Sequence, residues 1–299
     1  ASDCSTDGTD AIVLSFEDQG VRLARVEERK GKEHAQKHAV EKASGEILVF
    51  SDVATRLDPT GVKNIVMNFS DPKIGCVSSV DQFLDQDKRI RGESLYIKYE
   101  MFLRKLESRV NTLVGLSGSF FAARKIVCRN WAADLQSDFN TLINARKMGL
   151  RGVSDPQSVG YYSNISDERH EFDRKVRTVV RGISVLMRNL GMLNPFQFGL
   201  FSWQLFSHKL CRWLVPFAMI LVFVSNLILA FGSLFYLILF VLQLSFYFFA
   251  LQSGRTSLLN KSKILKMPSF FVQVNLSILN AWYRYLRGER MVTWTPSRR

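Results

Sequence analysis

The sequence predicts an α/β domain followed by a helical region that enters a membrane. The first observation is a short apolar run at residues 47–50, which lies between Gly45 and Pro59. A run of this length between chain-breaking residues is typical of a buried strand in an α/β sheet. The second observation is the segment 213–251, which contains no charged residue. It is long enough for two membrane-spanning helices of about 20 residues each.

The pattern of apolar and turn-forming residues predicts the other elements of the first half. We expect a turn at residues 2–9, helices at 10–16, 29–45, 59–69 and 137–149, strands at 21–24 and 74–80, and a polar loop at 81–92. Alanines that recur every four residues predict that the helix at 29–45 packs closely on the sheet. Gly45 predicts the end of that helix.

A further amphipathic helix is predicted at residues 94–108. Its apolar side chains recur at helical spacing, with charged residues between them: Leu95, Tyr99, Phe102 and Leu106. We interpret this stripe as part of the core of the domain. The alternative is a membrane-binding face, which the mixture of positive and negative charges around the stripe disfavours.

The charge of the chain is divided unevenly along its length. The 299 residues carry a net charge of +13, but the part from Arg174 onward holds sixteen basic residues and one acidic residue, so residues 1–173 carry −2. The basic residues flank apolar segments, as expected for a chain that contacts anionic lipid headgroups. No nucleic-acid-binding motif accompanies the charge, so we expect no nucleic-acid partner. The four cysteines lack the spacing of a metal site or a disulfide framework, which predicts free thiols.

Asp52 follows the predicted strand at residues 47–50 directly. Open α/β sheets bind their ligands at the carboxyl ends of their strands, so Asp52 is a candidate binding residue; the alternative is that it only turns the chain. Lys32 lies in the first turn of a predicted helix, where a diphosphate would meet its charge and the free backbone N–H groups. His34 and His38 have the spacing of metal ligands but no third ligand nearby, so we interpret them as surface histidines.

Three segments together resemble the family 2 glycosyltransferases, which have the nucleotide-sugar-binding, Rossmann-like GT-A fold. They are the turn Asp3-x-Ser5-x-Asp7-Gly8-Thr9, then Gly31-Lys32-x-x-Ala35, then the strand that ends at Asp52. The resemblance implies that Asp3 contacts the nucleoside, that Lys32 lies near the nucleotide, and that Asp52 occupies the first position of the Asp-x-Asp motif. The first strand of the family fold does not precede the turn, so we expect that an N-terminal part of the natural protein is missing.

The second position of the Asp-x-Asp motif is Ala54 in this sequence. In the family the second Asp ligates Mn²⁺ or Mg²⁺, and the resemblance implies such a cofactor at Asp52, because the leaving diphosphate needs charge neutralisation. Ala54 cannot ligate an ion, so Asp52 would hold it through water or with a further residue. Asp58 is the nearest further carboxylate in the sequence, and we interpret it as a cap before the next helix.

The predicted catalytic base is Asp138. In the family the base belongs to a Glu-Asp pattern at the start of a helix; Asp138 matches its Asp, whereas Ser137 replaces its Glu. Inverting sugar transfer needs a carboxylate that takes the proton of the acceptor hydroxyl as it attacks the anomeric carbon. The alternative role for Asp138 is a helix cap, and one carboxylate can do both. The segment Gly115 to Arg124 begins with small residues at a strand start, which predict the close approach of another group, the acceptor sugar or the donor hexose, or else a tight turn.

Arg174 and Arg177 share one face of a predicted helix with Arg181. Guanidinium groups on one face suit a diphosphate, and they equally suit lipid phosphates. Membrane-anchored members of the family, similar to cellulose and hyaluronan synthases, carry a Gln-x-x-Arg-Trp segment here that closes over the donor. This sequence has Arg174-Lys-Val-Arg177-Thr178. The resemblance implies that Arg174 and Arg177 bind the donor, whereas the missing Gln and Trp argue against a processive glucan synthase.

The remaining segments predict how the chain is divided. We expect a GT-A domain without its first strand at residues 1–165, a junction with interfacial helices at 166–208, and a membrane region at 209–299. The hairpin at about 213–251 has basic residues at both ends, which places both ends in the cytoplasm. The apolar segment 268–286 contains Arg284 and several amides, so we interpret it as an interfacial or re-entrant helix, with a full crossing as the alternative.

The resemblance implies inverting transfer of a hexose from a nucleotide-diphosphate sugar to a glycan or lipid-linked acceptor. The expected location is the cytoplasmic face of the inner membrane, in a multi-pass protein that contacts membrane lipids. The alternative function is a catalytically weak or inactive subunit of a polysaccharide synthesis or export complex, which Ala54 and the missing Trp suggest.

Overall fold

The computed structural model describes residues 1–84, 95–163, 168–252 and 263–293. The chain divides into two compact units. The first comprises Ala1–Ile165, Ser184–Phe206 and Arg290–Arg299, and the second comprises Ser166–Ile183 and Ser207–Glu289. Each unit is described by itself below. Most of the predicted loop at 81–92 lies outside the described residues, as do the basic residues Arg255 and Lys261.

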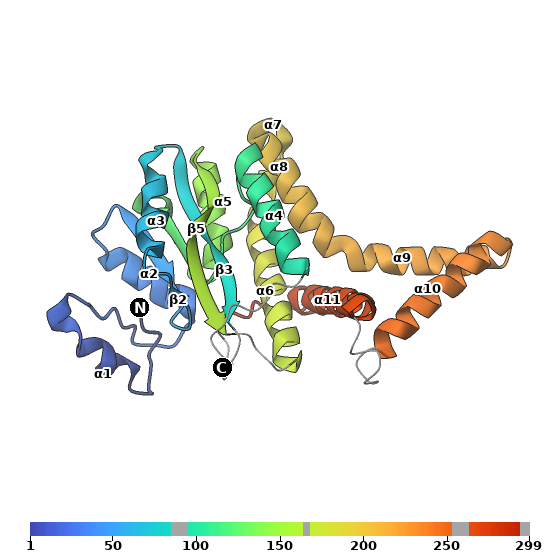
Figure 1. The fold of residues 1–299 in the computed structure, drawn as a ribbon, viewed down its shortest axis with the longest axis horizontal. Coiled ribbons are helices and arrows are strands. Elements are labelled where there is room, and N and C mark those ends of the chain that lie inside the picture. Colours follow the sequence, from blue (N-terminus) through green and yellow to red (C-terminus); the bar gives the residue numbers. More distant parts are fainter. Residues whose placement is uncertain (85–94, 164–167, 253–262, 294–299) are drawn as a thin grey trace. The chain divides into compact units, whose positions relative to one another are not determined.

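The first unit is built around one mixed β-sheet of five strands (Figure 1). The strands are β1 (Ile47–Ser51), β2 (Arg56–Leu57), β3 (Ile74–Leu84), β4 (Phe120–Arg124) and β5 (Arg151–Ser163), in the spatial order β1-β4-β3-β5-β2. Strands β3 and β5 pair in parallel, and the other pairs are antiparallel. The predicted α/β fold is confirmed, and both strands predicted at 47–50 and 74–80 are present.

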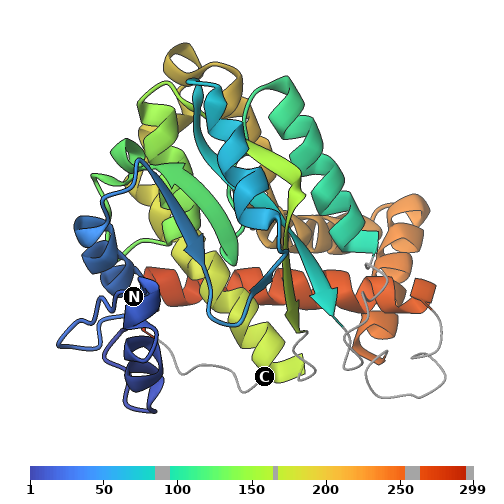
Figure 2. The same ribbon diagram turned by 60° about the vertical axis from the view of Figure 1, so that its left-hand side comes forward.

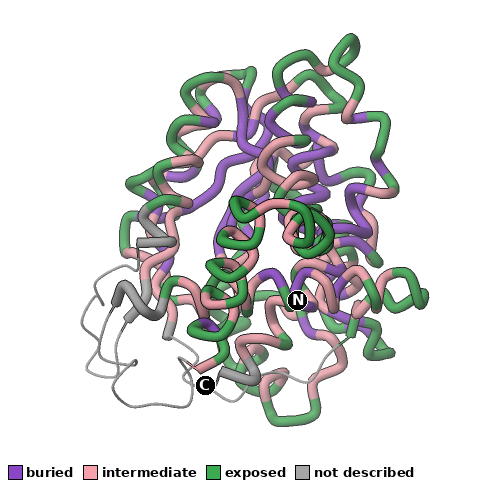
Figure 3. The backbone as a smooth tube through the Cα atoms, turned by 90° about the vertical axis from the view of Figure 1, so that its right-hand side faces the viewer, coloured by how far each residue is buried: buried purple, intermediate pink, exposed green. Residues whose placement is uncertain are grey.

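Helices cover both faces of the sheet (Figure 2). They include α2 (Lys32–Lys42), α3 (Gly61–Met67) and α5 (Ser137–Lys147). Successive residues of β4 point to opposite faces, so Phe120 packs with Ile65 of α3, whereas Phe121 packs with Leu142 of α5. Phe121 is fully buried and stacks on Phe50 of β1 with ring centroids 4.6 Å apart. Figure 3 shows the buried backbone concentrated in these central elements.

Shorter elements complete the first unit. They are α1 (Thr9–Leu14), η1 (Glu17–Gln19), η2 (Asn68–Ser70), α4 (Leu95–Val110), η3 (Lys125–Cys128), η4 (Leu190–Leu193), α7 (Pro195–Phe198) and α8 (Leu200–Leu205). Three local predictions are wrong. Residues 21–24 form no strand, and the nearest β-bridge joins Ser2 to Arg25. Helix α2 ends at Lys42 and its cap is Ala43 rather than Gly45. Strand β3 continues to Leu84, because residues 81–84 pair with β5.

Three residues of the predicted stripe, Tyr99, Phe102 and Leu106, do not belong to the core, so this prediction is wrong for them; the side chain of Leu95 lies outside the described residues. Tyr99, Phe102 and Leu106 are 58%, 57% and 39% exposed. A polar face of the helix meets the rest of the unit instead: Arg104 donates to Ser78 Oγ at 3.3 Å, and Glu107 Oε2 accepts from a backbone N–H at 3.3 Å. The backbone and hydroxyl groups around α4 need these partners, and helical spacing alone does not show which face meets them.

The second unit contains long apolar helices. They are α9 (Arg212–Ala230), α10 (Leu234–Gln252) and α11 (Lys263–Leu286), preceded by η5 (Phe206–Cys211); α6 (Glu168–Arg188) belongs in part to each unit. Two helical segments, Leu200–Ala230 and Leu234–Gln252, are long and apolar enough to cross a membrane. Only 11% and 6% of the most apolar stretch of each segment are buried. The predicted hairpin has its turn between α9 and α10, at Gly232.

The buried cysteines are expected to resist alkylation in the native protein. Cys76 and Cys128 are buried, and burial raises the pKa of the Cys128 thiol to about 12 and that of Cys76 further. At pH 8 this lowers the thiolate fraction on the order of a thousandfold relative to an ordinary cysteine. Maleimide labelling followed by mass spectrometry should modify Cys4 at once and the buried pair only after denaturation. Equal labelling rates for Cys4 and Cys128 in the native protein would contradict the burial.

Candidate functional site

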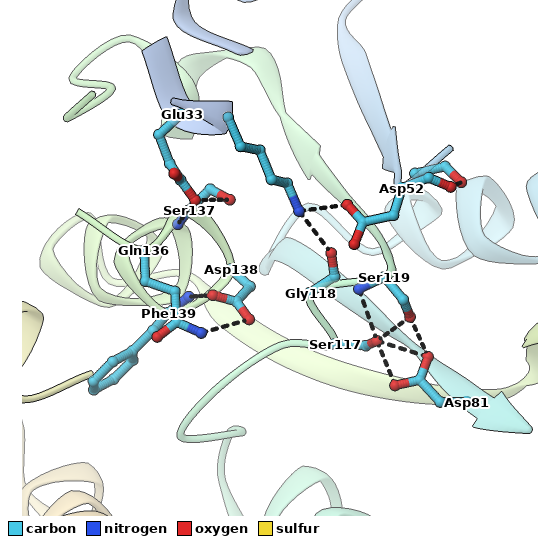
Figure 4. Close-up of polar contacts among 12 residues, drawn as sticks. Glu33, Asp52, Asp81, Ser117, Gly118, Ser119, Gln136, Ser137, Asp138 and Phe139 are labelled. Atoms are coloured by element: carbon cyan, nitrogen blue, oxygen red, sulfur yellow. Dashed lines mark hydrogen bonds and ion pairs between the residues drawn. The ribbon is translucent and has the colours of Figure 1, made fainter. Parts of the chain in front are cut away.

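Lys32 and Asp52 meet at one end of the sheet. Lys32 lies in the first turn of α2, and Asp52 follows β1 directly. The Lys32 Nζ donates to Asp52 Oδ1 at 2.5 Å and to the backbone carbonyl oxygen of Gly118 at 3.1 Å (Figure 4). The side chains are 26% and 37% exposed. A ligand can therefore reach a site in which a cation, a carboxylate and a backbone carbonyl converge.

Asp138 approaches the other side of Gly118. It is nearly buried in the first turn of α5, where Asp138 Oδ1 accepts from the Phe139 N–H at 2.8 Å and Oδ2 accepts from Gln136 Nε2 at 3.1 Å. A Cβ atom at Gly118 would lie 2.9 Å from Asp138 Oδ2. Lys32 and Asp138 therefore both lie close to Gly118, whereas the close approach of a sugar to this segment stays a prediction. The residue that caps α5 is Gln136, without a side-chain cap bond, so neither Ser137 nor Asp138 serves as its N-cap.

A buried carboxylate on β3 belongs to the same region and was missed in the sequence. Asp81 accepts hydrogen bonds from the hydroxyls of Ser117, at 2.7 Å, and Ser119. Burial raises the pKa of Asp81, these hydroxyls and Arg104 oppose the rise, and the charge of Asp52 adds to it. Asp81 follows the apolar run 74–80 as Asp52 follows the run 47–50. This similarity in sequence position could have identified Asp81 as a site residue, but the polar residues that follow it indicated a loop.

Glu33 is a second buried carboxylate that the sequence did not indicate. It lies on α2 beside Lys32, and its Oε1 is 3.5 Å from both the backbone nitrogen and the hydroxyl of Ser137. Ser137 is the residue that replaces the Glu of the family pattern. A carboxylate from α2 therefore reaches the start of α5, next to Asp138.

Asp3 fixes the start of α2. Its two carboxylate oxygens accept hydrogen bonds from the backbone N–H groups of Lys30, at 3.0 Å, and Gly31, at 3.1 and 3.0 Å. These contacts orient the first turn of the helix and with it Lys32. The contact of Asp3 with a nucleoside stays a prediction, whereas its role in placing Lys32 is visible directly.

Replacing Gly31 by alanine is expected to destabilise the first unit. Gly31 has φ +104°, and a Cβ there would lie 2.6 Å from the carbonyl oxygen of Val292. The strained backbone of a non-glycine residue at this φ and the displacement of Val292 should together lower the free energy of unfolding by about 1–3 kcal/mol. Gly20→Ala is the matched control, because Gly20 also has positive φ but no atom within 4 Å of a Cβ. Urea unfolding should show the larger loss for Gly31→Ala, and equal losses would show that the Val292 contact is unimportant.

Arg174 and Arg177 lie on α6 in the second unit. The Arg174 guanidinium donates to both carboxylate oxygens of Glu171 at 2.8 Å. Burial lowers the pKa of Arg177, and the charges of Arg181 and Arg174 lower it further. Three cations on one helix face are therefore present as predicted, and their contact with the donor stays a prediction.

The described residues do not complete a site for a divalent ion at Asp52. The side chain at the second motif position is the methyl group of Ala54. Asp58 accepts hydrogen bonds from the backbone and hydroxyl of Thr60, and so holds the turn before α3. The described part of the chain contains no group of three or more His, Cys, Asp or Glu side chains that could hold a metal. An ion at about 2.1 Å from Asp52 would also meet the ammonium group of Lys32.

Comparisons with known proteins bear on the fold of the chain. Residues 1–131 match the family model described as glycosyl transferase family 2. The structure is similar to the mannosyltransferase PcManGT from Pyrobaculum calidifontis in complex with GDP-Man and Mn²⁺, with a TM-score of 0.68, 21% identity, and 96% of this chain and 76% of that chain covered. The structure is also similar to S. aureus TarS in complex with UDP-GlcNAc, with a TM-score of 0.48 and 14% identity. The match covers 96% of this chain and 81% of that chain. No curated protein matches the chain in sequence.

Proposed function

We propose that the chain, whose residues 1–131 match the family 2 glycosyltransferases, is a member of that family and transfers a hexose, with inversion, to a glycan or lipid-linked acceptor. The donor is a nucleotide-diphosphate sugar. The observation that carries the proposal is the convergence of Lys32, Asp52 and Asp138 around Gly118. One side of this site offers charge to a diphosphate, and the other offers a base to an acceptor.

Asp138 acts as the base in this mechanism. Its carboxylate takes the proton of the acceptor hydroxyl while the hydroxyl oxygen attacks the anomeric carbon. The bond from that carbon to the diphosphate oxygen breaks on the opposite face, so the configuration inverts and the nucleoside diphosphate leaves. The hydrogen bonds from Phe139 and Gln136 hold the carboxylate in place, and its burial limits competition from water.

The donor is held from the nucleotide side. Lys32 and Asp52 lie at the diphosphate, Asp3 lies beside the nucleoside, and Arg174 and Arg177 contribute further positive charge to the leaving group. The side chains of Lys32 and Asp52 are both partly exposed, so a ligand can reach them, which supports this assignment. The similar mannosyltransferase is bound to GDP-Man, so GDP-mannose is the first donor to test.

The enzyme works at the cytoplasmic face of the inner membrane in this proposal. Two helical segments of membrane-spanning length support the location, as do the basic residues that flank them. A lipid-linked acceptor would reach the site from the bilayer surface.

A donor panel tests the proposal. The purified chain in lipid nanodiscs is incubated with GDP-mannose, UDP-glucose or UDP-GlcNAc and a membrane lipid extract, and released nucleoside diphosphate and labelled product are measured. Product with inverted anomeric configuration supports the proposal. Donor binding without release or transfer would instead support the alternative, an inactive subunit of a polysaccharide synthesis or export complex.

A further inference from the structure

We infer that Lys32 takes the place of the divalent ion in this chain: its ammonium group donates a charge-assisted hydrogen bond to the leaving diphosphate, and Asp52 positions that ammonium instead of ligating a metal. The inference rests on the proposed function, because it assumes a nucleotide-diphosphate donor. It assigns Asp52 a role that differs from the metal-binding role implied by the Asp-x-Asp motif.

The contacts of Lys32 are those of a fixed cation. A lysine ammonium carries three N–H donors. One is directed at Asp52 Oδ1 at 2.5 Å and one at the Gly118 carbonyl oxygen at 3.1 Å. The third has no partner among the described residues and is open to a phosphate oxygen, because the side chain is partly exposed. Lys32 also lies in the first turn of α2, where backbone N–H groups add to the attraction for an anion.

The ligands that the protein offers at Asp52 argue against a divalent ion bound at this position. A divalent ion takes six or more oxygen ligands, and beside a diphosphate one or two carboxylates hold it together with the phosphate oxygens. Ala54 removes one carboxylate, and the other already forms an ion pair with Lys32. An ion bound there would face an ammonium group of the same sign and a single carboxylate. The Lys32–Asp52 pair is balanced in charge without it.

Asp81 does not supply the missing ligand. The hydroxyls of Ser117 and Ser119 both donate to its carboxylate. Ser117 Oγ lies 2.7 Å from each of the two carboxylate oxygens. Both oxygens of this buried carboxylate are therefore already engaged by hydroxyl groups of the chain.

Nucleoside diphosphate binding tests the inference directly. GDP and UDP are titrated into the chain in nanodiscs by calorimetry, once with EDTA and once with Mn²⁺. We expect dissociation constants that agree within about twofold between the two conditions. Lys32→Met should weaken binding by about tenfold or more, with no rescue by Mn²⁺, whereas Lys32→Arg should retain most of it. Lys30→Met is the matched control, since Lys30 is exposed and pairs only with Glu28 among the described residues; its affinity should equal that of the unmodified chain.

Ala54→Asp provides a test by gain of function. Restoring the second carboxylate should create a Mn²⁺ site that electron paramagnetic resonance detects, and should make nucleoside diphosphate affinity rise with Mn²⁺. Binding by the unmodified chain that requires Mn²⁺ and is abolished by EDTA would overturn the inference but leave the proposed function intact. Failure of the folded chain to bind any nucleoside diphosphate in either condition would overturn both.

Discussion

Replacement of Asp138 by asparagine is expected to lower the turnover number about 10²–10⁴-fold, with donor affinity within about twofold of the original. The amide cannot take the acceptor proton. It keeps the size of the carboxylate, and its oxygen can still accept the hydrogen bond that Phe139 donates at 2.8 Å. Initial transfer rates and calorimetric titration with the donor nucleotide measure the two quantities separately.

Asp134→Asn is the matched control for this prediction. Asp134 lies just before α5 and is more than half exposed, where it pairs with Arg188 at 2.5 Å. Its replacement removes the same charge from the same segment but leaves the site untouched, so the rate should change by less than about twofold, in line with the small value of exposed ion pairs. If Asp138→Asn transferred sugar at the original rate, the assignment of the base would be wrong.

Phe121→Ala is expected to reduce the free energy of unfolding of the first unit by about 3–5 kcal/mol. Phe121 is fully buried and stacks on Phe50, which in turn stacks on Trp131 with centroids 5.0 Å apart. Truncation would leave a cavity between β4 and the helices that cover this face. The variant is expected to show a lower urea midpoint and a lower unfolding temperature than the original chain.

Phe196→Ala makes the same chemical change at a side chain that is 99% exposed. It should change the free energy of unfolding by less than about 0.5 kcal/mol. The comparison separates burial from the intrinsic difference between the two residues. A loss for Phe121→Ala no larger than that for Phe196→Ala would show that this aromatic stack does not stabilise the sheet.

The parts of the fold that the sequence predicted are those encoded by local patterns. A short apolar run predicted strand β1, and the alanine spacing predicted helix α2. These two elements carry Asp52 and Lys32, which form an ion pair in the structure. The position of Asp138 at the start of α5 followed from the family resemblance. These features depend on neighbours in the chain.

The parts that were missed depend on partners far away in the sequence. The polar groups near Ser78 and Val114 decide that α4 turns its polar face inward, and no pattern within α4 contains that information. Asp81 joins the site only because β4 brings Ser117 and Ser119 beside β3. Glu33 is buried because the start of α5 packs against it. Such pairings are set by tertiary packing rather than by spacing.

Val292 returns to Gly31 after the chain has passed through the whole apolar region. The segments before and after that region, Ser184–Phe206 and Arg290–Arg299, thus belong to the same compact unit as the sheet. A compact unit cannot lie on both sides of a bilayer, so any bilayer crossings between Phe206 and Arg290 must be even in number. The two candidate spans satisfy this parity. If both candidate spans cross a bilayer, the segments that flank the apolar region lie on the same side of it, and α11 cannot add a single further crossing.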